Sequence, residues 1–303
     1  MRILVTDGMD KSAIERLRAL GHDVVEQFYE SDDLGKALRD FDVVVVRSKT
    51  KIRANHIDEA KGGKLKMIIR GGIGVDNIDV VYAKENGVNV RNTPDASTES
   101  VAELALAHML ACARYVSISG CTMRNGQWEK KAYGKGVELV GKRLGIYGYG
   151  RIGKRLGVMA KGMGMNVLAY RRSAIPESID DAGIIYVTED KLLQTCDFIS
   201  LHAPSSADGP IITADKIAQM KDGVILINTS RGANVDEDAL LAALESGKVR
   251  AAGLDVWMEE PTHNEKLLAH PHVSCTPHIG AATVEAQRRI GAEIVHIISS
   301  MQA

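Results

Sequence analysis

Short runs of apolar, often β-branched residues alternate along the chain with stretches of helical periodicity. The first series of apolar runs lies at Ile3–Thr6, Val24–Phe28, Val43–Val46 and Met67–Ile69. A second series lies at Arg143–Gly148, Met165–Tyr170, Ile184–Val187, Phe198–His202, Val224–Asn228, Ala251–Val256 and Val273–Thr276. Continuous apolar runs of this kind are typical of parallel strands that helices cover on both faces. The two series predict an α/β fold with two parallel-sheet domains.

Two longer helical patterns indicate how the domains connect. Residues 97–114 have an apolar face and a plausible N-cap at Ser97, and we expect a helix there that joins the domains. The last pattern, Thr283–Ile298, places Ala286, Ile290, Ile294, Ile297 and Ile298 on one face. This final helix can return to the first domain and make it discontinuous. We therefore expect one domain over 1–96 plus 282–303 and another over 97–281.

The segment Gly120–Gly141 is rich in Gly, Lys and aromatic residues and has no clear period. It is either a surface loop or an arm that embraces a second subunit, and a homodimer is the expected assembly.

Composition excludes several classes of protein. The chain has 303 residues, 45% of them hydrophobic, and a formal net charge of −1, so no positive field attracts nucleic acid or a membrane surface. The N-terminus lacks the apolar run of a secretory signal, and no apolar stretch reaches the roughly 18 residues of a membrane span. A cytoplasmic protein is expected. The cysteines, Cys112, Cys121, Cys196 and Cys275, lack metal-ligand spacing, so we expect no metal site and buried, reduced thiols, although an isolated reactive one is possible.

A glycine-rich turn follows the first strand of the second series. Gly148-Tyr149-Gly150-Arg151-Ile152-Gly153 stands between that strand and a helical pattern that runs to Gly162. Such glycines allow a tight turn and a close approach of the backbone to a pyrophosphate, and the helix N-terminus offers free N–H groups. Because a second strand follows, the turn predicts a dinucleotide site rather than a ligand-free turn.

The residues after that second strand bear on the choice of cofactor. An NAD site usually has an acid there, but this chain has Arg171-Arg172-Ser173. Arginine cannot accept a hydrogen bond from a ribose hydroxyl, but it can bind a 2′-phosphate. The sequence therefore favours NADP over NAD, with the alternative that both arginines are solvated and NAD is used.

Three later strands end in a set of residues that suits hydride transfer with a 2-hydroxy acid. Arg231, Glu260 and His278 each follow a strand of the second series, and the carboxyl ends of parallel strands share one edge of the sheet. A histidine can take the hydroxyl proton, a carboxylate can orient it, and an arginine can hold the substrate carboxylate. Each residue alone could be a turn or surface residue, but together they predict a catalytic triad.

With these motifs the chain resembles the D-isomer-specific 2-hydroxy-acid dehydrogenases over nearly its whole length. The matching motifs are Arg70–Asn77, Ser100–Glu103, Gly148–Gly153, Asn228–Gly232, Gly253–Val256, Glu260–Pro261 and Thr276–Gly280. The resemblance implies two Rossmann-like or flavodoxin-like domains, with a discontinuous substrate domain around an inserted nucleotide domain. It implies Arg231 as substrate binder, Glu260 as partner of the base and His278 as acid/base.

The resemblance also implies the remaining contacts. Backbone groups of Gly72, Ile73 and Gly74 would receive the substrate carboxylate, and Asp255 would hold the nicotinamide carboxamide. The expected cofactor-binding residues are Val101, Gly148, Tyr149, Gly150, Arg151, Ile152, Gly153, Arg171, Arg172, Ser173, His202, Ala203, Pro204, Thr229, Ser230, Asp255, His278 and Gly280.

Within the family, the chain is most similar to short-form members that act on D-3-phosphoglycerate. Arg47, Ser48 and Arg70 match phosphate-facing positions, and Trp128–Lys131 matches an arm that reaches the neighbouring subunit's site. The alternative is that Arg47 and Arg70 pair with local acids. Arg171 and the unusual Ser205–Gly209 loop instead favour an NADPH-dependent hydroxypyruvate or glyoxylate reductase. A non-enzymatic, nucleotide-sensing corepressor with the same fold is a more distant alternative.

Overall fold

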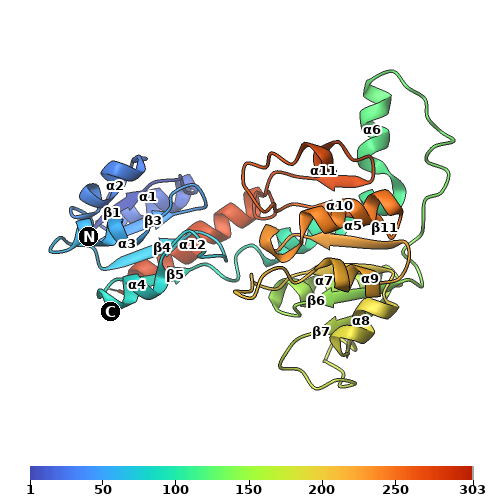
Figure 1. Ribbon diagram of the computed structural model, residues 1–303. Helices are drawn as coiled ribbons and strands as arrows, with labels where there is room; N and C mark the ends of the chain where they lie inside the picture. The colour runs from blue at the N-terminus through green and yellow to red at the C-terminus, as the bar shows by residue number, and fades with distance from the viewer. Residues whose placement is uncertain (302–303) are drawn as a thin grey trace. The chain divides into compact units, whose positions relative to one another are not determined.

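The computed structural model describes residues 1–301 and divides into two compact units (Figure 1). Unit 1 contains Met1–Ser97 and the described residues from Ala281 onward, and unit 2 contains Thr98–Gly280. Relative to the expected boundaries, Ser97 and Ala281 both group with unit 1. The expected first domain also included Gln302 and Ala303, which lie outside the described residues.

Unit 1 is a five-stranded parallel sheet in the order β2-β1-β3-β4-β5. Its strands are β1 (Arg2–Val5), β2 (Asp23–Glu26), β3 (Val43–Val46), β4 (Met67–Arg70) and β5 (Asn89–Asn92). Its helices are α1 (Lys11–Ala19), α2 (Ser31–Leu38), α3 (Ala54–Ala60), α4 (Val80–Glu85) and α12 (Val284–Ser300). The apolar face of α12 is buried with β1 and α1 in one hydrophobic core, because Ile290, Ile294 and Ile298 point inward.

The strand β5 is absent from the apolar runs of the sequence. Its four residues, Asn89–Asn92, alternate between exposed and half-buried positions, so the strand contains no continuous apolar run. It pairs with β4 and forms an edge of the sheet, so its outer side and one of its faces remain accessible to solvent.

Unit 2 is a seven-stranded parallel sheet in the order β12-β11-β10-β9-β6-β7-β8. Its strands are β6 (Arg143–Tyr147), β7 (Asn166–Tyr170), β8 (Ile185–Tyr186), β9 (Phe198–Leu201), β10 (Val224–Asn228), β11 (Val249–Leu254) and β12 (Val273–Cys275). Its helices are α5 (Thr98–Arg114), α6 (Val116–Arg124), α7 (Arg151–Gly162), α8 (Glu189–Thr195), α9 (Ala214–Gln219), α10 (Glu237–Ser246) and α11 (Glu265–Ala269), with a 3₁₀ turn at Gly232–Asn234.

Both sheets confirm the predicted α/β class with two parallel-sheet domains. In unit 2 the strand order reverses at β6, which lies between β9 and β7. A ligand crevice of an open parallel sheet lies at the carboxyl ends of the strands beside such a reversal.

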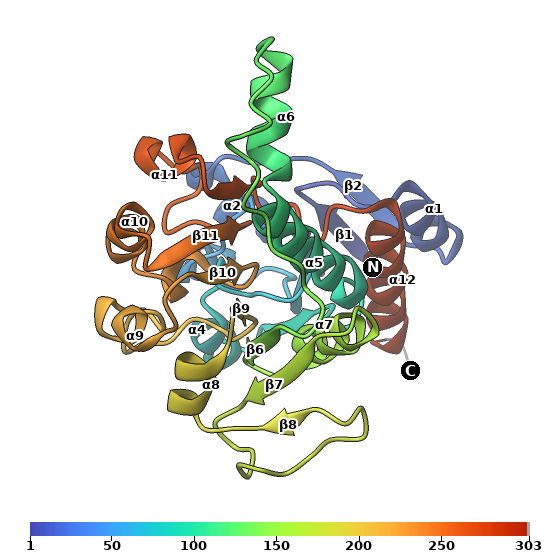
Figure 2. The ribbon, with the colours of Figure 1, turned by 90° about the vertical axis from the view of Figure 1, so that its right-hand side faces the viewer.

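The helix α6 corrects the expectation for the segment that begins at Gly120. That segment was expected to lack regular structure, but Gly120–Arg124 form the second half of α6. None of its residues is buried, and Figure 2 shows α6 extending away from the end of α5. Without a buried face the helix leaves no periodic pattern in the sequence.

Among the described residues, no single helix is long and apolar enough to cross a membrane. The helices α5 and α6 reach that length and hydropathy only when they are taken together, and they are bent by 67°.

The expectation of four buried thiols is wrong for two of them. Cys112 and Cys196 are buried, and burial raises the pKa of each thiol to about 12. Cys121 and Cys275 are exposed, because Cys121 lies on α6 and Cys275 ends the edge strand β12.

Candidate active site

The glycine turn Gly148–Gly153 connects β6 to α7. Gly148 has a φ of +93°, and a Cβ there would lie 2.5 Å from the backbone nitrogen of Ala203, so only glycine fits. Gly150 is the N-cap of α7 and makes no side-chain capping bond, while a Cβ at Gly150 would meet no atom within 4 Å. The first turn of α7 therefore presents its N–H groups next to open space, where a phosphate can approach.

Two buried polar atoms at the carboxyl ends of β9 and β10, on the same sheet edge as this turn, fit a bound dinucleotide. His202 Nδ1 after β9 and Thr229 Oγ1 after β10 have no hydrogen-bond partner within the described chain. The other ring nitrogen of His202 lies 2.9 Å from Ser200 Oγ, and burial lowers the pKa of His202 to about 4. A buried polar atom normally has a partner, so a neutral histidine and a hydroxyl in these positions suit a polar ligand.

The strand β7 ends at Tyr170, and Arg171, Arg172 and Ser173 follow as exposed residues. Tyr149, within the glycine turn, is buried and donates from its hydroxyl to Asp180 Oδ2 at 2.8 Å. The residues directly after β7 thus include two arginines and no acid.

The turn after β10 holds Arg231. Asn228, the last residue of β10, donates from Nδ2 to the carbonyl of Arg231 at 2.8 Å and accepts from the Ser230 hydroxyl at 2.8 Å. A Cβ at Gly232 would lie 1.9 Å from the carbonyl carbon of Trp257, so the Arg231 turn packs directly on the backbone of the next strand end. This close approach places Arg231 beside the loop that contains Glu260.

His278 and Glu260 form a hydrogen-bonded pair. His278 Nδ1 lies 2.7 Å from Glu260 Oε2, and the two side chains are 38% and 36% exposed. The other carboxylate oxygen of Glu260 accepts from the backbone N–H of Trp257 at 3.2 Å. Since Nδ1 is engaged by the carboxylate, the Nε2 side of the ring is the side that can exchange a proton with a ligand.

Burial is the largest influence on the Glu260 carboxyl and opposes its ionisation. The hydrogen bond from His278, the charges of His278 and Arg231 and the Trp257 N–H together outweigh it, so the pKa of Glu260 lies below its usual range. Glu260 is therefore a carboxylate at neutral pH.

Asp255 fixes the turn that contains His278. It is 1% exposed; Oδ1 accepts from the Thr276 hydroxyl at 2.6 Å and the Ile279 N–H at 2.8 Å, and Oδ2 from the Gly280 N–H at 2.9 Å. His278 itself donates its N–H to the Asp255 carbonyl and has a φ of +54°. A residue other than glycine in this left-handed region is strained, and the Asp255 bonds hold it there.

The other residues expected to bind substrate, besides Arg231 and His278, lie in unit 1 at the carboxyl ends of β3 and β4. Val46 pairs with Arg70, so Arg47 and Arg70 leave neighbouring strands at the same edge. A Cβ at Gly71 would lie 3.7 Å from Arg47 Cγ, and one at Gly72 would overlap Arg70 Nη1, so both side chains flank this glycine pair. Ser48 is exposed.

Asp7, which belongs to none of the sequence motifs, anchors the Arg47 loop. Its Oδ2 accepts from the backbone N–H groups of Arg47 at 2.7 Å and Thr50 at 3.0 Å. Residues at the end of β5 hold the Gly72–Gly74 loop. Asn92 Nδ2 donates to the Ile73 carbonyl at 2.6 Å, and the Thr93 N–H donates to the Gly72 carbonyl.

The structure thus gathers the expected site residues into two groups. Arg231, Glu260, His278, Asp255, the glycine turn and Arg171 share the carboxyl edge of the unit 2 sheet, and Val101 lies against Gly280. Arg47, Arg70 and the Gly72–Gly74 loop share the carboxyl edge in unit 1. Within residues 1–301, no three His, Cys, Asp or Glu side chains are grouped as a metal site.

Comparison with known proteins places the chain in a family. Residues 106–280 match the model described as D-isomer specific 2-hydroxyacid dehydrogenase, NAD binding domain. The chain is 48% identical over 302 residues to the hydroxypyruvate reductase of Thermotoga maritima, covering 98% of this chain and 97% of that protein. It is 42% identical over 303 residues to the D-3-phosphoglycerate dehydrogenase of Methanocaldococcus jannaschii, covering 99% of this chain and 57% of that protein.

A crystal structure of a glyoxylate reductase from Paecilomyes thermophila matches with a TM-score of 0.88 and 32% identity, covering 99% of this chain and 94% of that one. The chain therefore belongs to the D-isomer-specific 2-hydroxyacid dehydrogenases, oxidoreductases that act on the CH–OH group of the donor with a nicotinamide cofactor.

Proposed function

We propose that the chain interconverts a small D-2-hydroxy acid and its 2-oxo acid, and that His278 is the acid/base of the reaction. The observation that carries this proposal is the 2.7 Å pair of His278 Nδ1 and Glu260 Oε2 at the sheet edge that also holds the glycine turn. The bound nicotinamide supplies hydride chemistry. His278 takes the hydroxyl proton at Nε2 during oxidation and returns it to the oxo oxygen during reduction.

The neighbouring groups orient the substrate and stabilise charge. Glu260 favours the imidazolium that forms when His278 takes the proton, since an opposite charge in contact stabilises the charged form. Arg231 holds the substrate carboxylate and polarises the oxo oxygen. Asp255 accepts three hydrogen bonds within the chain, and a carboxylate can accept about four, so one more donor such as a carboxamide can be accommodated.

The first candidate substrate is D-3-phosphoglycerate, which would make the chain a D-3-phosphoglycerate dehydrogenase. Arg47 and Arg70 flank one glycine pair at neighbouring strand ends, and two guanidinium groups are the donors that a phosphate prefers. The relative from M. jannaschii is named for this activity.

The second candidate is the NADPH-dependent reduction of hydroxypyruvate or glyoxylate. The T. maritima relative, matched over nearly its full length, is named hydroxypyruvate reductase, and the matched crystal structure is a glyoxylate reductase. Arg171 and Arg172 after β7 favour NADP(H) over NAD(H) for either substrate.

We also propose a homodimer that α6 helps to form. This helix has no buried residue, and Val116, Met123 and Trp128 in and after it are 58%, 58% and 77% exposed. Large apolar side chains gathered on a projecting segment are typical of protein interfaces. Light scattering on the purified chain measures the mass directly, and a monomer at micromolar concentration would contradict this proposal.

A substrate panel tests the proposed function. Initial rates of NADH and NADPH consumption are measured with phosphohydroxypyruvate, hydroxypyruvate, glyoxylate and pyruvate, and the product configuration is determined. We expect turnover of at least one of these 2-oxo acids, with the D-hydroxy acid as the product wherever the product is chiral, and with phosphohydroxypyruvate preferred if Arg47 and Arg70 bind phosphate. Absence of turnover with all four acids and both cofactors would contradict the proposal.

A further inference from the structure

A row of hydrogen-bonded polar side chains, with His108 and Ser274 buried at its centre, crosses unit 2 from α6 to the turn that contains His278. His108 on α5 is 3% exposed; its Nε2 lies 3.0 Å from Thr276 Oγ1, and its Nδ1 lies 2.9 Å from Ser274 Oγ. Ser274 Oγ in turn lies 3.0 Å from Ser117 Oγ on α6. Neither the glycine turn nor the proposed triad uses any of these four side chains.

The hydrogen-bond partners determine which atoms donate along the row. Thr276 has a single hydroxyl proton, which it gives to Asp255 Oδ1 at 2.6 Å, so toward His108 its oxygen acts as an acceptor. His108 therefore carries its proton on Nε2, and in the neutral ring Nδ1 accepts from Ser274. Ser274 then accepts from Ser117, and every donor in the row points toward the Asp255 carboxylate.

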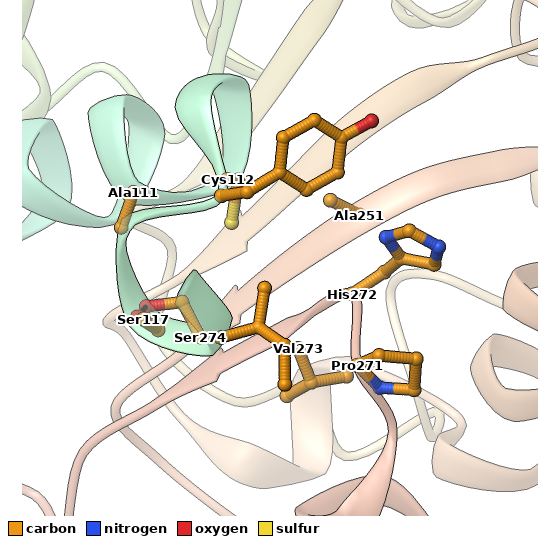
Figure 3. Close-up of a pocket in the computed structure, with 10 residues that line it drawn as sticks. Ala111, Cys112, Ser117, Ala251, Pro271, His272, Val273 and Ser274 are labelled. Carbon is orange, nitrogen blue, oxygen red and sulfur yellow. Dashed lines mark hydrogen bonds between the residues drawn. The ribbon is translucent and has the colours of Figure 1, made fainter. Parts of the chain in front are cut away.

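The position of the ring is fixed by close packing. A Cβ at Gly253 on β11 would lie 2.6 Å from His108 Cβ and 3.1 Å from Cγ, so the side chain leaves its helix directly over this glycine. At the other end of the row, Ser117 and Ser274 line a pocket beside the bend between α5 and α6, together with Cys112 and His272 (Figure 3).

The charges around the ring agree with a neutral histidine. Burial lowers the pKa of His108, and the negative charge of Asp255 opposes that shift without reversing it. A neutral ring with one donor and one acceptor matches the two hydroxyl groups that face it.

We propose that His108 is a positioning residue for the reaction. His108 fixes the Thr276 hydroxyl, and the hydrogen bond from that hydroxyl keeps the Asp255 carboxylate in place. Asp255 in turn accepts from the N–H groups of Ile279 and Gly280. These two bonds keep His278 in its left-handed conformation. This inference rests on the proposed role of His278, because only then does the position of that ring control the rate.

Three substitutions of His108 separate the donor from the bulk of the ring, and none of them branches at Cβ, where Gly253 leaves no room. His108→Gln can keep a donor near the Nε2 position toward Thr276. His108→Asn is shorter, keeps an acceptor near Nδ1 toward Ser274 and loses the donor. His108→Leu loses both. A buried hydrogen bond of typical strength corresponds to up to about a tenfold change in an equilibrium.

We expect kcat to fall about five- to tenfold in His108→Leu and His108→Asn and to recover to within about twofold of wild type in His108→Gln. The KM for the 2-oxo acid is expected to change by less than about twofold in all three, because Arg231 is not in the row. Thermal melting shows whether each variant folds. Ser117→Ala, which removes only the far end of the row, serves as the matched control and is expected to retain wild-type kcat.

A second measurement separates this inference from the proposed function. The hydrogen-exchange rates of the Ile279 and Gly280 amides measure how firmly these groups are bonded to Asp255, and the measurement needs no turnover. We expect the rates to increase about tenfold in His108→Leu and His108→Asn but not in His108→Gln. Equal effects in all three variants, or none, would overturn the positioning role. A wild-type chain that turns over no 2-oxo acid would instead contradict the proposed function, and the exchange data would still test the row.

Discussion

Replacing Glu260 with glutamine tests the coupling between the carboxylate and the base. The change keeps the size of the side chain and its acceptor for the Trp257 N–H, and it removes the charge that faces His278. A buried charge-assisted hydrogen bond contributes about 1.5–3 kcal/mol. Because both side chains are more than one third exposed, solvent screening reduces this contribution, and we adopt about 1.4 kcal/mol, which corresponds to about a tenfold change in an equilibrium.

The direction of the shift follows from the charges. Reduction of the 2-oxo acid needs a proton from His278, and the Glu260 carboxylate favours the ring that carries it, so the loss of this charge moves the alkaline limit of reduction to lower pH. Oxidation needs the neutral ring and therefore begins at a lower pH in the variant. Because the pKa of Glu260 lies below its usual range, the carboxylate stays charged near neutral pH, and its own titration does not produce this limit.

The assay is the pH dependence of kcat/KM in the reductive direction, from about pH 5 to about pH 10, followed by absorbance of the reduced cofactor. Glu259→Gln is the matched control, since Glu259 is the exposed acid next in the chain and has the same chemistry. A Glu260→Gln profile that superimposes on wild type, with Glu259→Gln unchanged, would refute the coupling and with it the proposed pair.

Three further predictions concern the cofactor, the substrate and the scaffold. Arg171→Asp should raise KM for NADPH at least tenfold and lower it for NADH, and a wild type that ignores NADPH would show the interpretation wrong. Alanine at both Arg47 and Arg70 should raise KM for phosphohydroxypyruvate far more than for hydroxypyruvate, and equal losses would indicate that the arginines are structural. Gly232→Ala forces a Cβ to within 1.9 Å of the Trp257 carbonyl carbon, so we expect urea unfolding to show a loss of about 3 kcal/mol or more.

Hydrophobic patterning predicted most of the fold because most strands here are buried on both faces. Val43–Val46 and Val224–Asn228 match the strands β3 and β10 residue for residue. The pattern failed where burial on both faces is absent, at the edge strand β5 and at α6, which has no buried residue. The location of Cys121 on α6 explains why its predicted burial was wrong as well.

The candidate triad was predictable because three chemically unusual residues follow three apolar strands. Asp7, His108 and Thr276 were not, because their roles depend on partners tens to hundreds of positions away, such as Ser274 beside His108. No local spacing records such a contact. The family resemblance implied Asp255 as a partner of the nicotinamide carboxamide, but it did not indicate that Asp255 holds the turn of His278.

The most direct test of the central claim is kcat of His278→Ala at saturating cofactor and 2-oxo acid. We expect a decrease of about 10²- to 10⁴-fold, the range for a positioned general acid/base, with cofactor affinity within about twofold of wild type. Affinity is retained because the glycine turn is held by its own contacts, such as the packing of Gly148 against Ala203. A decrease in kcat smaller than about tenfold would contradict the account and assign the proton transfer to another group.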